Sequence, residues 1–573
     1  YGVKDYAPQD IKGYTANTPP RDLSAESGGS ANVAGTYISP YQCEDYIHIL
    51  LITDGEPSVD NHADSDILSL PITAKDYEVP APIKMDEGRF SYLNVLAKWM
   101  QHNDINPNKE GNQHATLHTI GFGKDAIDNA GELLREAARV GGGEYFAAEN
   151  PADLTETIFN SLYNILKVNS TFTSPSVASN NFDRTRSLDN VYYAMFLPGD
   201  GPRWRGNLKK LKLVGNTLVD KSGSPALDAS GSISDDAQTF WSKAGAVPDG
   251  NDVRQGGVAA MLQNKTNRKV QINNGLSLID IDANNIASLS EAFSGLCGPQ
   301  PCQADAKLFD KYIGYALGQD VGDDDDDDNF TEMRADVFGD PLHSKPVVVS
   351  YSASDTRIIV GTNAGFLHMF KDLGDDSIDE SWAFIPAELF KNIPILEANK
   401  NDSPKVYGVD GSPVVHFNDA NGDGIVDGGD KVWLFFGLRR GGSSYYAVDI
   451  TAPDSPKLMW HINDQTAGFS ELGQSWSKPL ISYIKPYGEK PVLVFSAGYS
   501  TNKDIAGIAT EDPNGRGIFI VDAQTGSLVW SLTPDTQYKG KHSVAGGVAV
   551  MDSDLDGYTD RIYFADTGGS VWR

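Results

Sequence analysis

A repeat of about 67 residues fills the last part of this 573-residue chain. Four segments there open on a proline or a small residue and continue as an apolar run. The openings lie at Pro346, Pro413, Pro479 and Gly546, at successive spacings of 67, 66 and 67 residues. Repeats of this length indicate a solenoid or a propeller, because one unit cannot bury its own apolar face. We therefore predict a β-propeller over residues 336–573.

Each opening strand is followed by a second strand, a glycine-rich turn and a third strand, in segments 358–370, 433–450, 493–526 and 562–573. This order describes a four-stranded blade, whose edges are protected when the blades close radially. The period exceeds that of most propellers, so we expect long inserted loops. Four blades are fewer than a closed propeller usually needs, and residues 168–335 are candidates for earlier blades.

Residues 419–430 place oxygen atoms at alternate positions of a short loop. Ca²⁺ takes six to eight oxygen ligands, and glycine at position six allows the sharp turn of such a loop. Without a cation, carboxylates this close would repel one another. The predicted ligands are Asp419, Asn421, Asp423, the carbonyl of Ile425, Asp427 and, at position twelve, Asp430.

Residues 552–560 repeat this spacing around Gly557, with Tyr563 in place of an acid at position twelve. Another oxygen or a water must complete the ligand set there. Both loops are expected to join β-strands, so an EF-hand signalling switch is not expected, and a plain acidic turn is the alternative for each loop. The predicted ligands are Asp552, Asp554, Asp556, the carbonyl of Tyr558 and Asp560.

The first third of the chain alternates expected strands and helices. The continuous apolar run of the first strand suits burial on both faces. This order predicts a parallel sheet with helices on both faces, and ligands of such sheets lie at the carboxyl ends of strands, where Asp54 lies. The expected strands are 46–53, 115–123 and 144–148, and the expected helices are 89–101, 125–140 and a segment opened by Asn150 and Pro151.

The segments ILLITDGEPS, HTIGFG and GGGEYFAAENPADLTETIFNSL resemble the second half of a von Willebrand factor A domain. The resemblance implies that residues 1–167 are the C-terminal part of such a domain. It also implies that Asp54 helps to hold Mg²⁺ at an adhesion site. The main Asp-x-Ser-x-Ser motif of that family is absent from this chain, and Thr18 is a candidate for its loop threonine. A helix cap or a turn residue is the alternative for Asp54.

Residues 168–335 read as a β-rich connecting region with glycine, proline and serine turns. Cys297 and Cys302 flank a four-residue turn that brings them within disulfide range, and we predict that they are bonded in an oxidising compartment. No histidine accompanies them, so zinc is not expected. Cys43 is either a buried thiol or has a partner outside this chain.

The formal charge of −31 disfavours nucleic acid as a partner and favours cations. The six aspartates 323–328 are expected to form a solvated loop, with a weak calcium sink as the alternative. No apolar stretch reaches the ~18 residues of a membrane span. The chain begins at Tyr1 and ends inside an expected strand at Arg573, so we expect both ends to be cut.

No HExxH, GxSxG, Walker or GxGxxG motif occurs. His114 and His118 are four residues apart, but they lie on an expected strand, so they do not form a site with helical spacing. The sequence therefore offers no nucleophile–base pair, and we expect no enzyme.

The segments GDPLHSKPVVV, VGTNAGFLHMF, FGLRRGGSSYYAVD and DSDLDGYTDRIYFADTGGSVWR resemble the PilC/PilY family of type IV pilus tip adhesins and pilus biogenesis factors. The resemblance also takes in YQCEDYIHILLITDGEP and RWRGNLKKLKL. It implies an extracellular protein, exported through the periplasm to the pilus tip or cell surface, that contacts minor pilins and host or abiotic surfaces.

In that family, calcium in a propeller loop regulates pilus extension and retraction, and the matching positions here are Asp552, Asp554, Asp556 and Asp560. The resemblance implies roles in pilus assembly, adhesion and twitching motility. The chain has no Arg-Gly-Asp, so integrin binding through that tripeptide does not carry over. Two alternatives remain open: a propeller dehydrogenase, because the blades also resemble those of quinoproteins, and a structural surface adhesin unrelated to pili.

Overall fold

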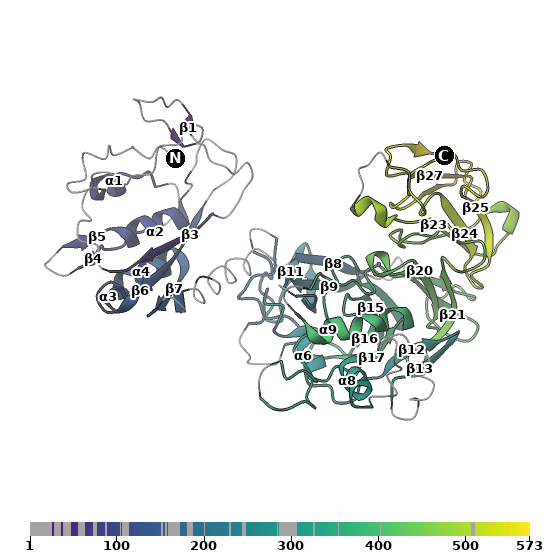
Figure 1. The fold of residues 1–573 in the computed structure, drawn as a ribbon, viewed down its shortest axis with the longest axis horizontal. Helices are drawn as coiled ribbons and strands as arrows, with labels where there is room; N and C mark the ends of the chain where they lie inside the picture. Colours follow the sequence, from purple (N-terminus) through teal and green to yellow (C-terminus); the bar gives the residue numbers. More distant parts are fainter. Residues whose placement is uncertain are drawn as a thin grey trace. The chain divides into compact units, whose positions relative to one another are not determined.

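The computed structural model divides into two compact units, Tyr1–Asn169 and Ser170–Arg573 (Figure 1). In the first unit it describes residues 26–27, 36–37, 47–55, 63–72, 77–85, 89–103, 105, 114–150, 153–154 and 158. In the second it describes 172–179 and the chain from 187 onward, except for 200, 229–230, 243–247, 283–284, 286–305, 325–326, 353, 401–402 and 506–509. The domain boundaries expected at residues 167 and 335 stay predictions.

A parallel sheet forms the centre of the first unit. Its strands are β3 (Ile47–Thr53), β6 (Ala115–Phe122) and β7 (Gly142–Ala148), with β6 in the middle. The burial predicted for the first strand is found in β6, which is buried along nearly its whole length. β3 is only half-buried and exposes Ile52, because among the described strands it pairs on one side alone.

Helices α2 (Leu93–His102) and α4 (Gly131–Val140) pack on each other and on one face of this sheet. Ala97, Leu117 and Ala137 form the shared core. The prediction of a single helix over 125–140 is wrong. Helix α3 (Gly123–Asn129) and helix α4 are separate, and Ala130 caps the end of the first and the start of the second. The helix predicted from Asn150 lies largely outside the described residues. The smaller elements are β1 (Glu26–Ser27), β2 (Thr36–Tyr37), α1 (Asp64–Leu68), β4 (Ile83–Lys84) and β5 (Phe90–Ser91).

A histidine pair joins β3 and β6. Nδ1 of His48 lies 3.2 Å from Nε2 of His118, whose Nδ1 accepts the backbone N–H of Glu144. Burial lowers the pKa of both imidazoles, and in His118 the charge of His48 adds to the effect. This pair was not predicted from the sequence, because the two histidines are 70 residues apart in the chain.

Acidification is therefore expected to destabilise the first unit. The unfolded chain binds protons at these histidines at a higher pH than the folded chain, so stability falls as the pH drops through the window below the ordinary histidine pKa of 6.5. Thermal unfolding of the full chain between pH 7 and pH 5 tests this. His48→Gln should flatten the dependence, and an equally steep dependence in the variant would assign it to other groups.

The second unit begins with an antiparallel sheet of β8 (Phe172–Ser179), β9 (Ser187–Leu197), β10 (Arg205–Val214) and β11 (Thr217–Val219). Helix α6 (Gly257–Gln263) packs against β10, and a further helix is α8 (Ala306–Leu317). Side chains of β9 and β10 share a core with the first repeat sheet, for example Tyr192 and Leu208 with Ile358.

The first repeat forms β14 (Val347–Ser352), β15 (Asp355–Gly361), β16 (Leu367–Asp372) and β17 (Ile378–Ile385). A hairpin from the preceding region extends this sheet: β12 (Val270–Asn274) pairs with β17 in parallel, and β13 (Ser277–Asp280) follows it. A 3₁₀ segment η6 (Ala387–Asn392) and helix α9 (Ile393–Ala398) lead to the next repeat. The connecting region is thus hydrogen-bonded to the first repeat.

The next two repeats are four-stranded antiparallel meanders, and the last has three strands. Each predicted strand–turn–strand segment contains a hairpin of its sheet. The strands are β18 (Val414–Asn418), β19 (Lys431–Gly437), β20 (Ser444–Asp449) and β21 (Lys457–Asn463); β22 (Leu480–Ser482), β23 (Val492–Ser496), β24 (Ile518–Asp522) and β25 (Leu528–Leu532); and β26 (Ala549–Met551), β27 (Arg561–Ala565) and β28 (Val571–Trp572). Short 3₁₀ turns are η7 (Arg439–Gly441), η8 (Lys485–Tyr487) and η9 (Thr501–Asp504).

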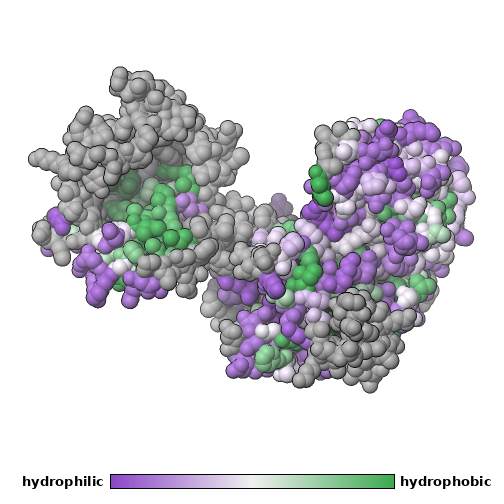
Figure 2. Space-filling view, viewed as in Figure 1, coloured by the Kyte–Doolittle hydropathy of each residue, from purple (hydrophilic) through white to green (hydrophobic). Residues whose placement is uncertain are grey.

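The cores of the second unit lie between successive sheets. One core joins the first and second repeats, and others join the second to the third and the third to the fourth. Phe436 packs on Phe384 across the first boundary, and Tyr445 packs on Phe495 across the second. The visible outer face of this unit is mainly hydrophilic, with isolated hydrophobic residues (Figure 2). This face-to-face packing of successive sheets is the arrangement that the repeat predicted.

Candidate functional site

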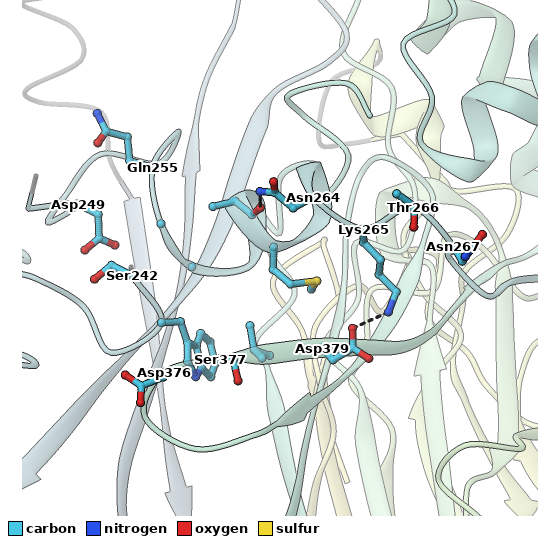
Figure 3. A pocket seen from close by; sticks show the side chains of 16 residues that line it. Ser242, Asp249, Gln255, Asn264, Lys265, Thr266, Asn267, Asp376, Ser377 and Asp379 are labelled. Atoms are coloured by element: carbon cyan, nitrogen blue, oxygen red, sulfur yellow. Dashed lines mark hydrogen bonds and ion pairs between the residues drawn. The ribbon is translucent and has the colours of Figure 1, made fainter. Parts of the chain in front are cut away.

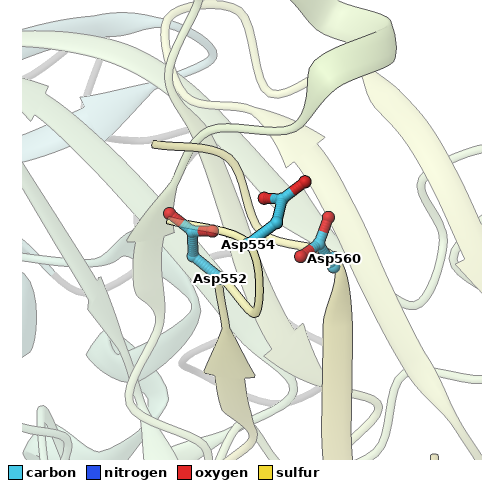
Figure 4. A group of neighbouring side chains, drawn as sticks. All are labelled: Asp552, Asp554 and Asp560. Carbon is cyan, nitrogen blue, oxygen red and sulfur yellow. The ribbon is translucent and has the colours of Figure 1, made fainter. Parts of the chain in front are cut away.

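The loop between β26 and β27 gathers three carboxylates. Asp552, Asp554 and Asp560 each place an oxygen within 4.8 Å of the others (Figure 4). Gly557 has φ +90°, the left-handed conformation that glycine adopts without strain. Its N–H donates to Asp552 at 2.8 Å. The carboxylates at positions one, three and nine of the loop therefore lie close together, while Asp556 is not part of the group.

Asp556 is instead held by a lysine of the neighbouring sheet. The Nζ of Lys485 lies 2.7 Å from Oδ2 of Asp556, and this contact lowers the pKa of the carboxyl group. Desolvation and the nearby charges of Asp556 and Asp560 raise the pKa of Asp554. Carboxylates that lie this close together favour the binding of a cation, because a cation relieves their mutual repulsion.

The loop between β18 and β19 has matching hydrogen bonds. The N–H of Gly424 donates to Asp419 at 2.8 Å, as Gly557 does to Asp552. The N–H of Ile425 donates to Asp423 at 2.8 Å, as that of Tyr558 does to Asp556 at 3.0 Å. Asn421 donates to Asp423 and, at 3.4 Å, to Asp427. The two loops thus share these turn hydrogen bonds, although among the described residues only the 552–560 loop brings three carboxylates together.

Asp430 closes the 419–430 loop from inside. The side chain is 2 % exposed and accepts the N–H groups of Ala420 at 2.9 Å and Asp427 at 2.8 Å. These backbone hydrogen bonds lower the pKa of Asp430. The residue predicted as a position-twelve ligand therefore fixes the loop shape.

Both loops also reach the preceding sheet. The N–H of Val426 donates to the carbonyl of Tyr351 at 3.3 Å, and that of Thr559 donates to the carbonyl of Tyr483 at 2.8 Å. Thr559 also shares a hydroxyl contact of 2.6 Å with Ser482. A cation in either loop would brace two neighbouring blades as well as the two strands that the loop joins. The sequence could not show these contacts, which link separate repeats.

A cavity of about 810 Å³ lies beside α6 and the β16–β17 turn (Figure 3). The described side chains that line it are mainly amides, hydroxyls and carboxylates, with Trp241 and Met261. The lysine in the lining, Lys265, is paired with Asp379 at 2.5 Å. Histidine and cysteine are absent from the described lining of this cavity.

The remaining predicted sites are less complete. Asp54 is exposed after β3 and joins no group of three acidic, histidine or cysteine ligands among the described residues. Cys43, Cys297, Cys302 and Thr18 lie outside the described residues. Of the acidic run, Asp324 forms an ion pair of 2.7 Å with Arg203, so this part of the run is anchored instead of freely solvated.

Residues 345–573 match the model of the PilY1 beta-propeller domain. The propeller of this chain belongs to the PilY1 family. This confirms the expected relation to the PilC/PilY family, and with it the β-propeller of the C-terminal part.

Proteins similar to this chain include the type IV pilus biogenesis factors PilY1 of Pseudomonas aeruginosa. The protein of strain UCBPP-PA14 is 25% identical over 75% of this chain and 35% of its own length. That of strain PAO1 is 30% identical over 43% of this chain and 21% of its own length. The crystal structure of the P. aeruginosa PilY1 C-terminal domain is 27% identical, covers 38% of each chain and gives a TM-score of 0.28.

The alignments span about a third or less of the length of these curated relatives. Within the described part of the chain, helices are too short or too polar to cross a bilayer. The von Willebrand A-type assignment of the first unit remains a prediction.

Proposed function

We propose that this chain acts in type IV pilus biogenesis as an exported, calcium-binding protein at the pilus tip or cell surface. It would promote pilus assembly, control extension and retraction, and support adhesion and twitching motility. The minor pilins would be its partners in the pilus, and host or abiotic surfaces its targets. The observation that carries the proposal is the PilY1 propeller at residues 345–573, together with relatives named as pilus biogenesis factors.

Calcium is the cofactor that the loops support best. The ligands offered by the 552–560 loop are carboxylate oxygens, which suit a hard cation, and the convergence of Asp552, Asp554 and Asp560 supports one ion there. The 419–430 loop shares its turn geometry and would hold a second ion. Since each loop contacts the preceding blade, ion binding would stiffen the blade boundary.

We predict that the 419–430 loop binds calcium more tightly. Asp430 already fixes its shape, whereas in the 552–560 loop Lys485 competes for Asp556. Calcium titrations of single-loop variants, Asp423→Ala and Asp554→Ala, would rank the two sites. Lys485→Ala should raise the calcium affinity of the 552–560 loop, and tighter binding by the 552–560 loop of the native chain would contradict the predicted order.

The first unit is proposed as the C-terminal part of a von Willebrand A-type domain. The parallel order β3–β6–β7 and the place of Asp54 at the carboxyl end of β3 support this. Mg²⁺ at Asp54 would need ligands from outside the described residues. Loss of Mg²⁺-dependent surface attachment in Asp54→Ala, with piliation unchanged, would support the assignment, and unchanged attachment would count against it.

The pilus role is tested in the organism that makes this protein. Deleting the gene should reduce sheared surface pilin by at least about tenfold, and the full-length gene should restore it. The protein should also appear on purified pili. Equal piliation with and without the gene would contradict the proposal.

A further inference from the structure

A cluster of arginine and aromatic side chains lies at the end of the propeller opposite the calcium loops. Those loops join the first and second strands of a sheet. The cluster lies where the chain enters first strands and where it turns from the second to the third strand. It consists of His343, Tyr407, Arg439, Arg440, Trp476, Lys478 and Tyr499, from three successive repeats.

The arginines are stacked on aromatic rings. The guanidinium of Arg439 lies 4.6 Å from the ring centre of Trp476, and that of Arg440 lies 5.5 Å from the same ring and 5.1 Å from Tyr407. Tyr499 stacks on Trp476 at 4.2 Å. Arg440 also contacts Asp504 and the hydroxyl of Tyr407, each at 3.4 Å. The guanidinium N–H groups that the cluster presents are therefore mainly those of Arg439, and such groups match planar oxyanions such as carboxylates.

A small cavity of about 70 Å³ opens between these groups. It is lined by His343, Ser412, Arg439, Trp476 and Lys478, among others. Arg439 donates one N–H to the buried carboxylate of Asp410 at 3.2 Å, and His343 contacts the same carboxylate at 2.8 Å. Among the described residues, the ammonium of Lys478 and the other N–H groups of Arg439 meet no acceptor.

The backbone at Arg439 is strained. Its φ of +52° lies in the left-handed region, which costs free energy for any residue with a Cβ. The corresponding turn of the next repeat has Gly498, with φ +104°. This repeat therefore keeps a strained arginine where its neighbour uses glycine, and the arginine is the residue that lines the cavity.

We infer that this cluster binds an acidic peptide segment of a protein partner, with one carboxylate in the cavity between Arg439 and Lys478. The exposed Lys345 at the edge would meet a neighbouring acidic side chain. The chain as a whole is strongly anionic, at −31, but its distant charges are screened beyond ~8 Å at physiological salt. The charges within the cluster therefore determine whether an acidic peptide binds, and we expect binding to weaken as the salt concentration rises.

A fluorescently labelled hexaglutamate peptide, titrated against the full chain at low salt, tests the inference. Arg439→Gly should weaken binding by about tenfold or more, because it removes a charge-assisted contact while glycine suits the backbone. Lys478→Ala should weaken binding severalfold. The affinity of Arg439→Lys should lie between those of the native chain and Arg439→Gly, because lysine keeps the positive charge but lacks the planar guanidinium that donates two parallel hydrogen bonds. Unfolding temperatures of all variants check the fold.

Lys457→Ala, at an exposed lysine that begins the outer strand β21, is the matched control and should bind as the native chain does. The inference is overturned if the native chain does not bind the peptide, if the cluster variants bind normally, or if Lys457→Ala loses as much affinity. Displacement of the peptide by inorganic sulfate at constant ionic strength would also overturn it, since the site would then be a general anion site.

Discussion

Glu380→Ala is expected to destabilise the second unit by about 3–5 kcal/mol, the usual effect of breaking a buried ion pair from one side. Arg268 holds Glu380 through two hydrogen bonds of 2.7 and 2.8 Å, and His368 contacts it at 2.8 Å. All three side chains are at most 1 % exposed. Removing the carboxylate leaves a guanidinium buried between β12, β16 and β17 without its partner.

Denaturant unfolding followed by tryptophan fluorescence measures this loss, because eight of the nine tryptophans lie in the second unit. Lys541→Ala, at an exposed lysine, should leave the midpoint nearly unchanged. A Glu380→Ala midpoint equal to that of this control would contradict the expected role of the ion pair.

The same buried network makes the stability of the second unit depend on pH. Burial alone would raise the pKa of Glu380, but the charge and hydrogen bonds of Arg268 lower it to about 2. A lowered carboxyl pKa stabilises the fold above the ordinary value of 4.5, and that stability is lost as the pH falls toward 2. The gap in stability between the native chain and Glu380→Ala should therefore narrow over this window.

Chelation of calcium is expected to produce the second large effect. An ion that binds only the folded chain stabilises it by about 2.7 kcal/mol when its concentration is one hundred times the dissociation constant. Two such loops would then contribute about 5 kcal/mol, which a chelator removes. Thermal unfolding in calcium, in magnesium and in chelator measures this, and magnesium should stabilise less because it demands a smaller octahedral site.

The combined variant Asp552→Ala/Asp554→Ala should keep only the share of the stabilisation that comes from the 419–430 loop. Unfolding temperatures that are identical with and without calcium would contradict both sites.

The repeat and the loop spacing could be predicted because they are local. Pro413 and Pro479 recur at a fixed spacing just before the first strand of a sheet. Gly557 adopts a left-handed backbone conformation that glycine takes without strain, so its place in the loop marks a sharp turn. The break at Ala130 was not predicted, since the residues on both sides favour helix. The half-burial of β3 was not predicted either, because an apolar run does not show how many neighbours a strand has.

Contacts between repeats were beyond sequence reasoning. Lys485 meets Asp556, and Arg439 meets Trp476, where successive repeats come together. Lys485 belongs to no motif named above, and the arginine pair of the segment FGLRRGGSSYYAVD precedes two glycines and reads as an ordinary turn. The φ of Arg439, which marks it as unusual, is visible only in the folded chain.

Isothermal titration with calcium tests the central claim most directly, by counting ions bound to the full chain after chelator has been removed. We expect two ions in the native chain, one in Asp419→Ala/Asp423→Ala, one in Asp552→Ala/Asp554→Ala, and none when both pairs are combined. Calcium uptake by the combined variant equal to that of the native chain, or no uptake by the native chain, would contradict the account.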